Sequence, residues 1–179
     1  MYPLLHTDAV QAFQYMKCDV VELGVDLLTL SAHKIYGPKG IGLLYVRRCM
    51  NPESCIVSPL IVGGGQENGM RSGTENVPAI VGFAKAVEIV EKLRVKESKR
   101  VAALRDALWT GIKKTVPDAE LNGSAVYRLP NNLNVYLPGR PAQDVCIELD
   151  LMGIAVSPGT ACASRAAEPS RVLKALGFS

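Results

Sequence analysis

The segment Ser31–Gly40 (SAHKIYGPKG) contains a lysine directly after a histidine, at the point where an apolar run ends. A lysine on a rigid mount at the end of a buried strand can act as a nucleophilic amine and form a Schiff base with an aldehyde. A solvated loop charge has the same residue type, so Lys34 alone leaves both interpretations open. The sequence around it has to decide between them.

Asp8 is the second candidate, because it follows an earlier short apolar segment, Tyr2–Leu5. Pyridoxal phosphate is an aldehyde cofactor that needs a carboxylate beside its pyridine nitrogen, since the protonated ring is the electron sink. An aspartate at a strand end is also a common turn cap. Asp8 and Lys34 together favour a pyridoxal-phosphate site over two unrelated loop charges.

The elements that would position these residues are two continuous apolar runs, Val25–Leu30 and Gly40–Val46. Such runs predict strands buried on both faces. The glycine-rich segment Gly63–Thr74 predicts a loop whose backbone closely approaches another group. Apolar residues at helical spacing predict one long helix from Pro78 to about Val116, and its charged middle indicates a bridge between two packed bodies.

The second body is predicted as a β-β-α-β arrangement followed by a helix. Its expected elements are strands near Glu120–Asn122 and at Asn132–Leu137, a helix over Pro141–Met152, a strand at Ile154–Val156 and a last helix at Ser170–Leu176. We place the domain boundary in the long helix, giving domains 1–93 and 94–179. The small-residue segment Ser157–Glu168 is a predicted loop that carries Cys162.

Composition narrows the function classes. The net charge of +3 among 179 residues is too small and dispersed for a nucleic-acid-binding face. The sequence has neither a membrane-span pattern nor a signal-peptide pattern, so we expect a cytoplasmic protein, with an organelle matrix left open. The five cysteines are odd in number and lack a Cys-x-x-Cys pair, which argues against a disulfide framework or zinc site. Four of them are predicted small hydrophobes: Cys18, Cys49, Cys55 and Cys146.

Four segments in register then carry a specific resemblance: HTDAVQ (from His6), SAHKIYGPKGIGLLYVRR (from Ser31), GGGQENGMRSGTENVPAIVGFAKAV (from Gly63) and SPGTACASRAAEPSRVLKALG (from Ser157). Together they resemble the pyridoxal-phosphate-dependent cysteine desulfurases of the class V aminotransferase family, in the branch that builds iron–sulfur clusters. The resemblance implies an α/β fold, namely the C-terminal half of a fold type I large domain followed by a small α+β domain.

The resemblance also implies roles for individual residues. Lys34 would be the Schiff-base lysine, and Cys162 the nucleophile that takes sulfur from L-cysteine, leaving alanine and a persulfide. The cofactor contacts implied are Asp8 to the pyridine nitrogen, Gln11 to the ring hydroxyl, Ser31 and His33 to the phosphate, and Thr74 to the phosphate held by a partner subunit. A homodimer and a sulfur-acceptor or iron–sulfur scaffold protein would be the partners. No resident metal is implied, although the Cys162 persulfide could be a transient iron–sulfur ligand.

Several family features have no counterpart in these 179 residues. The family carries a glycine-threonine phosphate turn, a histidine stacked on the ring and an asparagine before HTDAVQ, and an arginine that clamps the substrate carboxylate after the last motif. We therefore expect a chain truncated at both ends that binds the cofactor poorly. A selenocysteine lyase, a class V aminotransferase and a non-catalytic interaction module stay as alternatives.

Overall fold

The computed structural model describes residues 3–47, 57–159 and 170–177 of the chain. Two compact units are present, Met1–Val101 and Ala102–Ser179, and the division lies inside helix α1 (Val77–Thr115). The predicted single long helix is thus confirmed, whereas the assignment of 1–93 and 94–179 as functional domains stays a prediction. No helix in the described ranges is both long and apolar enough to cross a membrane.

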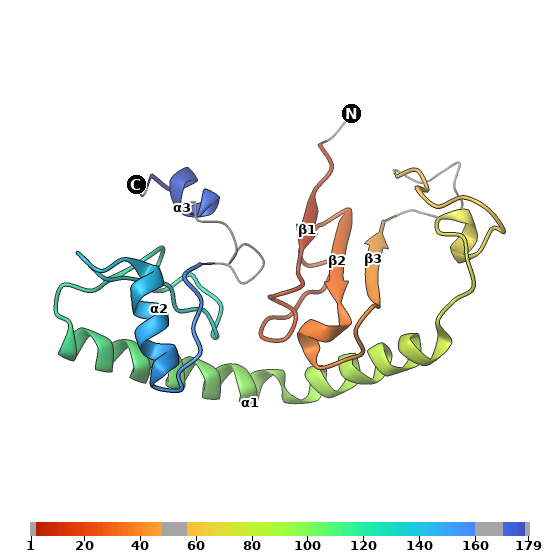
Figure 1. Ribbon diagram of the computed structural model, residues 1–179. Coiled ribbons are helices and arrows are strands. Elements are labelled where there is room, and N and C mark those ends of the chain that lie inside the picture. Colours follow the sequence, from red (N-terminus) through yellow and green to blue (C-terminus); the bar gives the residue numbers. More distant parts are fainter. Residues whose placement is uncertain (1–2, 48–56, 160–169, 178–179) are drawn as a thin grey trace. The chain divides into compact units, whose positions relative to one another are not determined.

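The first unit is built on a three-stranded sheet with the strand order β1-β2-β3 (Figure 1). Its strands are β1 (His6–Asp8), β2 (Leu27–Ser31) and β3 (Gly42–Val46). β1 runs parallel to β2, and β3 runs antiparallel to β2. The short 3₁₀ helix η1 (Ala32–Ile35) continues directly from β2, and a second one, η2 (Glu67–Gly69), lies in the glycine-rich segment before α1.

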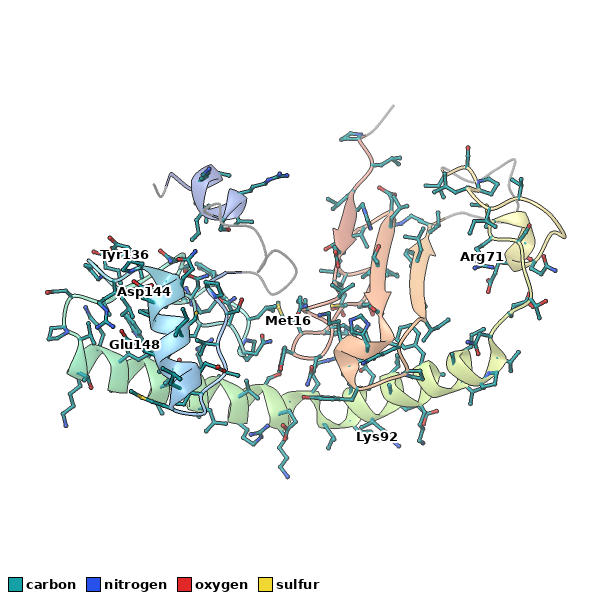
Figure 2. All side chains as sticks on the ribbon, in the orientation of Figure 1. Met16, Arg71, Lys92, Tyr136, Asp144 and Glu148 are labelled. Carbon is teal, nitrogen blue, oxygen red and sulfur yellow. The ribbon has the colours of Figure 1, made fainter. Side chains whose placement is uncertain are left out.

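Alternation along β2 separates the two faces of this sheet, because successive side chains of a strand point to opposite sides. Leu28 and Leu30 belong to a buried core that also contains Phe83, Ala86 and Val90 of α1. Thr29 and Ser31 lie on the other face and are only half-buried. Lys92, on the far side of α1, points away from the sheet (Figure 2). Helix α1 therefore covers one face of the sheet.

The expectation that Gly40–Val46 is buried on both faces is wrong. Leu43 and Leu44 of β3 point to opposite faces, and their side chains are 46% and 51% exposed. β3 ends the described sheet on one side, so it has a strand partner only at β2. A run of apolar residues is consistent with a half-exposed edge strand as well as with a buried one, and its sequence does not distinguish them.

Glycines bring the loop after Lys34 into direct contact with α1. A Cβ atom on Gly82 would lie 2.7 Å from Cγ of Pro38, and one on Gly37 would lie 3.2 Å from Cβ of Ala86. Neither glycine needs positive φ, so close approach explains the residue type at both positions. The loop and the helix are packed against each other without room for a methyl group.

The segment between β1 and β2 is also fastened to α1. The guanidinium of Arg94 donates through Nε to the carbonyl of Phe13 at 3.2 Å and lies 4.9 Å from the centre of the Phe13 ring. Ser98 donates to the carbonyl of Tyr15 at 2.8 Å. Arg94 is buried, and its charge is balanced by Glu91 one turn earlier. These contacts hold the two successive turns that follow Asp8.

The second unit contains a two-stranded antiparallel sheet and two short helices. Its elements are β4 (Glu120–Leu121), β5 (Val135–Tyr136), α2 (Ala142–Leu151) and α3 (Arg171–Ala175). The strand predicted at Ile154–Val156 is wrong. The backbone N–H of Ile154 donates to the carbonyl of Leu149 and so closes the end of α2, and the next residues are irregular. A short apolar segment such as Ile154–Val156 forms a strand only where a neighbouring strand is available to pair with it.

The contact between Gly82 and Pro38 generates a prediction about stability. Gly82→Ala should lower the free energy of unfolding by about 1–3 kcal/mol, because the new methyl group overlaps the rigid proline ring. Gly111→Ala is the matched control in the same helix, where an added Cβ meets nothing within 4 Å. It should raise the free energy of unfolding by about 0.5–1 kcal/mol through helix propensity. Urea unfolding followed by circular dichroism measures both, and equal stabilisation would contradict the tight contact.

Candidate active site

Asp8 and Ser31 lie at one edge of the first unit's sheet. β1 and β2 are parallel, so their carboxyl ends meet at the same edge, and Asp8 and Ser31 are the last residues of the two strands. The backbone N–H of Ala9 donates to the carbonyl of Thr29 at 3.0 Å, and the Asp8 carboxylate accepts from the N–H of Val10 at 3.0 Å. Asp8 is therefore held at a defined point of the edge with its side chain exposed.

Ser31 and His33 form a hydrogen-bonded pair. Oγ of Ser31 lies 2.9 Å from Nδ1 of His33, which is in the first turn of η1. A neutral imidazole and a hydroxyl carry one proton each, and their mutual hydrogen bond uses one of the two. The pair thus keeps one donor for a ligand when His33 is neutral and two when the imidazole is protonated. Either state suits an anionic group.

Lys34 is placed by the short helix η1 between two buried anchors. Ala32 and Ile35 are almost fully buried in the core, whereas Lys34 is half-buried. Tyr36 ends the helix in the left-handed conformation, with φ of 63°, and its backbone N–H donates to the carbonyl of Ala32. Such a conformation is unfavourable for a tyrosine and persists only where the surroundings impose it. Lys34 therefore has the rigid mount that its sequence position predicts.

Of the six predicted site residues that the structure describes, four lie at this edge and two lie elsewhere. Asp8, Ser31, His33 and Lys34 lie at the edge. Gln11 is exposed in the turns that follow Asp8, and Thr74 is exposed between η2 and α1. Hydrogen bonds that hold the glycine-rich loop join Gly65 to Ser72 and Gly73 to Gln66, inside the loop itself. Cys162 lies outside the described residues.

Sequence reasoning missed a second polar pair on the same face of the sheet. Nε2 of His6 lies 2.8 Å from Oγ1 of Thr29, across β1 and β2. The register pairs His6 with Leu27 and Asp8 with Thr29, so His6, Asp8, Thr29 and Ser31 all point to the face that α1 does not cover. The available signal was spacing: each missed residue lies two positions before a predicted site residue on the same strand.

Two cysteines that are not predicted site residues are described by the structure, and their burial indicates whether they could act as nucleophiles. Cys18 and Cys146 are free and half-buried. Burial raises the pKa of the Cys18 thiol, only partly opposed by the nearby Arg94, so this cysteine forms less of the reactive thiolate at neutral pH. Within the described ranges, no three or more histidine, cysteine or acidic side chains gather as metal ligands do.

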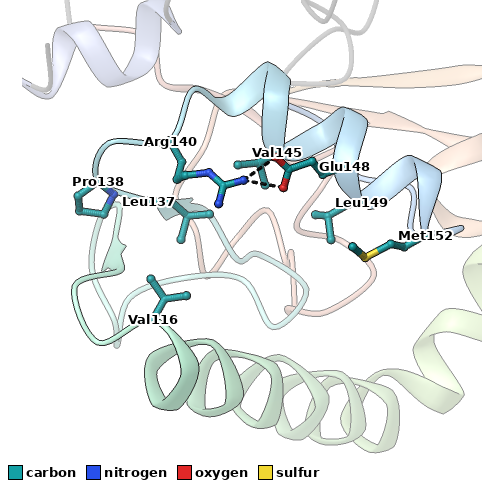
Figure 3. Close-up of a pocket in the computed structure, with 8 residues that line it drawn as sticks. All are labelled: Val116, Leu137, Pro138, Arg140, Val145, Glu148, Leu149 and Met152. Atoms are coloured by element: carbon teal, nitrogen blue, oxygen red, sulfur yellow. Dashed lines mark hydrogen bonds and ion pairs between the residues drawn. The ribbon is translucent and has the colours of Figure 1, made fainter.

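A cavity of about 210 Å³ lies in the second unit (Figure 3). Its walls are mainly apolar, and the residues drawn there are Val116, Leu137, Pro138, Arg140, Val145, Glu148, Leu149 and Met152. Nη2 of Arg140 donates to Glu148 Oε1 at 2.7 Å and closes one side of the cavity with an ion pair. The lining has no cysteine, serine, threonine, lysine or histidine and contains none of the predicted site residues. The polar edge of the first unit is the better candidate for chemistry.

Comparisons with known proteins agree on one family. The aminotransferase class-V family matches residues 3–178. A cysteine desulfurase IscS from Dictyoglomus turgidum is 46% identical over 96% of the chain and 42% of its own length. A NifS-like protein from Rickettsia africae superposes with a TM-score of 0.83 at 33% identity, over 98% of the chain and 44% of that structure. SspA, solved in complex with cysteine, superposes with a TM-score of 0.73 at 36% identity, over 98% of the chain and 46% of that structure. The chain thus spans less than half the length of each.

The Ser31–His33 pair yields a prediction that needs no ligand. The chain contains only two histidines, His6 and His33, so their ring nitrogens can be followed individually by NMR. Ser31→Ala should shift the His33 Nδ1 resonance because its hydrogen-bond partner is lost, and should leave the His6 resonances in place. Ser31→Thr, which keeps a hydroxyl, is the control. An unchanged His33 spectrum in Ser31→Ala would show that the pair does not form.

Proposed function

The chain belongs to the aminotransferase class-V family, and from this premise we propose that it carries out cysteine desulfurase chemistry with pyridoxal 5′-phosphate. The family resemblance and the mixed α/β fold expected from the sequence motifs are confirmed by the family match and the similar structures. The observation that carries the proposal is the placement of Asp8, Ser31, His33 and Lys34 along one sheet edge.

The chemistry of this donor set fits the cofactor. Pyridoxal phosphate presents an aldehyde, a pyridine nitrogen and a phosphate, which call for an amine, a carboxylate and hydrogen-bond donors. Lys34 supplies the amine and Asp8 the carboxylate. The Ser31–His33 pair supplies donors for the phosphate, 2.9 Å apart and one residue from the lysine. Gln11 and Thr74 would add contacts to the ring hydroxyl and, from a partner subunit, to the phosphate.

When bound, the cofactor supplies an electron sink for charge that develops at the substrate Cα. Asp8 would keep the pyridine nitrogen protonated through its carboxylate. Nζ of Lys34 would hold the aldehyde group until the amino group of L-cysteine replaces it there, and the freed amine would then accept the Cα proton of the substrate. Its mount between the buried residues Ala32 and Ile35 keeps the amine close to one position, as proton transfer requires.

Cys162 would take the sulfur atom. Its thiolate would attack the sulfur of the substrate, so that an S–S bond forms and the C–S bond breaks. The electron pair of the C–S bond would stay on the substrate carbon, which takes up a proton, so that alanine leaves and Cys162 becomes a persulfide. The persulfide would pass its sulfur to an acceptor protein such as an iron–sulfur scaffold. The relatives named cysteine desulfurase and the similar structure solved with cysteine support this choice of substrate. A homodimer and a cytoplasmic location belong to the same proposal.

A trapping experiment tests the role of Lys34. The chain would be incubated with pyridoxal 5′-phosphate, reduced with borohydride and digested, and the modified lysine would be located by mass spectrometry. Lys34 should carry the label, and Lys34→Ala should lose at least about 90% of it, since the amine is the attachment point. Lys39→Ala, which removes an exposed lysine of the same loop, should keep it. Equal labelling of both lysines would contradict a dedicated site.

Cys162→Ser distinguishes a desulfurase from the alternative family activities. The variant should bind the cofactor as the parent chain does but form no persulfide when L-cysteine is added, because serine cannot accept the sulfur. Cys18→Ser, at a half-buried cysteine whose pKa is raised, should leave persulfide formation unchanged. Persulfide is measured by alkylation and mass spectrometry. Aminotransferase activity that survives Cys162→Ser would favour the alternative.

A further inference from the structure

Residues 9–16, which follow Asp8 at the end of β1, form two successive hydrogen-bonded turns, called the Asp8 turns below. The carbonyl of Ala9 accepts two backbone N–H groups at 3.0 Å, and the carbonyl of Ala12 accepts two more at 2.9 Å. Gln11, the proposed contact to the cofactor ring hydroxyl, is exposed in the first of these turns. The placement of the Asp8 turns therefore decides where the side chains of Asp8 and Gln11 meet a ligand.

Two side chains of α1 bind the end of the Asp8 turns. The last carbonyls of a helical turn have no partner within it and need a donor from elsewhere. Nε of Arg94 donates to the carbonyl of Phe13 at 3.2 Å, and Oγ of Ser98 donates to the carbonyl of Tyr15 at 2.8 Å. Arg94 and Ser98 are four residues apart, so they lie on the same side of the helix. One face of α1 therefore fastens the Asp8 turns at two points.

The burial of Arg94 indicates that its bond to this carbonyl matters. A buried charge is unfavourable unless it is paired and hydrogen-bonded. Glu91 supplies the paired charge, but the Glu91 side chain is 53% exposed, so an ion pair alone would not require the cation to lie inside. An apolar side chain could fill the space beside the Phe13 ring, but it would leave the Phe13 carbonyl without its donor. Only a donor at position 94 keeps this carbonyl satisfied.

The same helix also meets the other half of the proposed site. Gly82 of α1 packs against Pro38 in the loop that follows Lys34, with no room for a methyl group between them. Helix α1 is continuous from Gly82 to Ser98, and a continuous helix holds its residues at fixed separations, about 1.5 Å of rise per residue. Its contacts therefore set where the Asp8 turns lie relative to the loop of the lysine.

We propose that Arg94 and Ser98 are positioning residues. By fastening the Asp8 turns to α1, they hold the Asp8 carboxylate and the Gln11 amide at a fixed place relative to the amine of Lys34. The consequence for cofactor binding rests on the proposed function, whereas the fastening itself does not. Both residues act through the backbone of the turns, so their loss should loosen the turns while the rest of the sheet keeps its order.

The fastening is tested in the cofactor-free chain by ¹⁵N relaxation, which reports the order of each backbone N–H in the folded state. In Arg94→Met the order parameters of residues 9–16 should fall from about 0.85 to about 0.6, the values of rigid and flexible backbone, while those of β2 stay unchanged. Ser98→Ala, which favours the helix, should lower them in the second turn, and Ser98→Thr should restore them. Unchanged order in both Arg94→Met and Ser98→Ala would overturn the proposal.

Arg100→Met is the matched control in the same helix. Arg100 pairs with Glu97 three residues earlier, as Arg94 pairs with Glu91, and in the described part of the chain its guanidinium bonds only to Glu97. The substitution should leave the order parameters of the Asp8 turns unchanged. Equal loosening by Arg94→Met and Arg100→Met would show that the bond to the turns is not the cause, and would also overturn the proposal.

Cofactor affinity supplies the second readout, as a double-mutant cycle. Arg94→Met should weaken binding of pyridoxal 5′-phosphate about five-fold in the parent chain. In a chain that already carries Asp8→Asn and Gln11→Ala, it should weaken binding less than about two-fold, because the contacts that it positions are gone. Equal losses in both backgrounds would overturn the positioning role. Absence of any binding by the parent chain would contradict the proposed function instead, and the order parameters would still decide the fastening.

Discussion

The packing of α1 against one face of the small sheet is the constraint on which the proposed site depends. The helix meets the loop after Lys34 at Gly82 and Gly37, where no methyl group fits, and it meets the sheet through Leu28 and Leu30. Because this face is closed by apolar contacts, the residues that alternate with them along β2 point the other way. The polar residues of the proposed site therefore lie on the face of the sheet opposite the hydrophobic core.

Rigidity at the site comes from apolar anchors beside Lys34 and from hydrogen bonds to α1 after Asp8. The lysine follows a buried alanine and precedes a buried isoleucine, and the turns after Asp8 are held by Arg94 and Ser98 of α1. A positioned amine gains little from an exposed ion pair, whose energy is small in water. The burial of Ala32 and Ile35 restricts Lys34 more effectively, because moving either neighbour would expose apolar surface to water.

The open face combines two histidine–hydroxyl pairs with one carboxylate and one amine. Each hydroxyl has a single proton, so the donor that a ligand meets depends on the tautomer of the neighbouring imidazole. His6 and His33 each pair with a hydroxyl residue of β2, although they are far apart in sequence. Relatives that are more than twice as long match almost the whole chain, which places this arrangement within the portion that the chain shares with them.

By itself the sequence determined what is local. The 39-residue helix was predictable from apolar spacing. Residue types and motifs make Lys34, Asp8, Ser31 and His33 candidates for a site, and their roles stay predictions. Tertiary structure decided what depends on partners. Ile154 closes α2 and the residues after it form no strand, β3 is half-exposed, and His6 is hydrogen-bonded to Thr29. Periodicity and turn chemistry act between near neighbours, whereas strand pairing and the choice of the covered face join residues distant in the chain, and no local pattern encodes that choice.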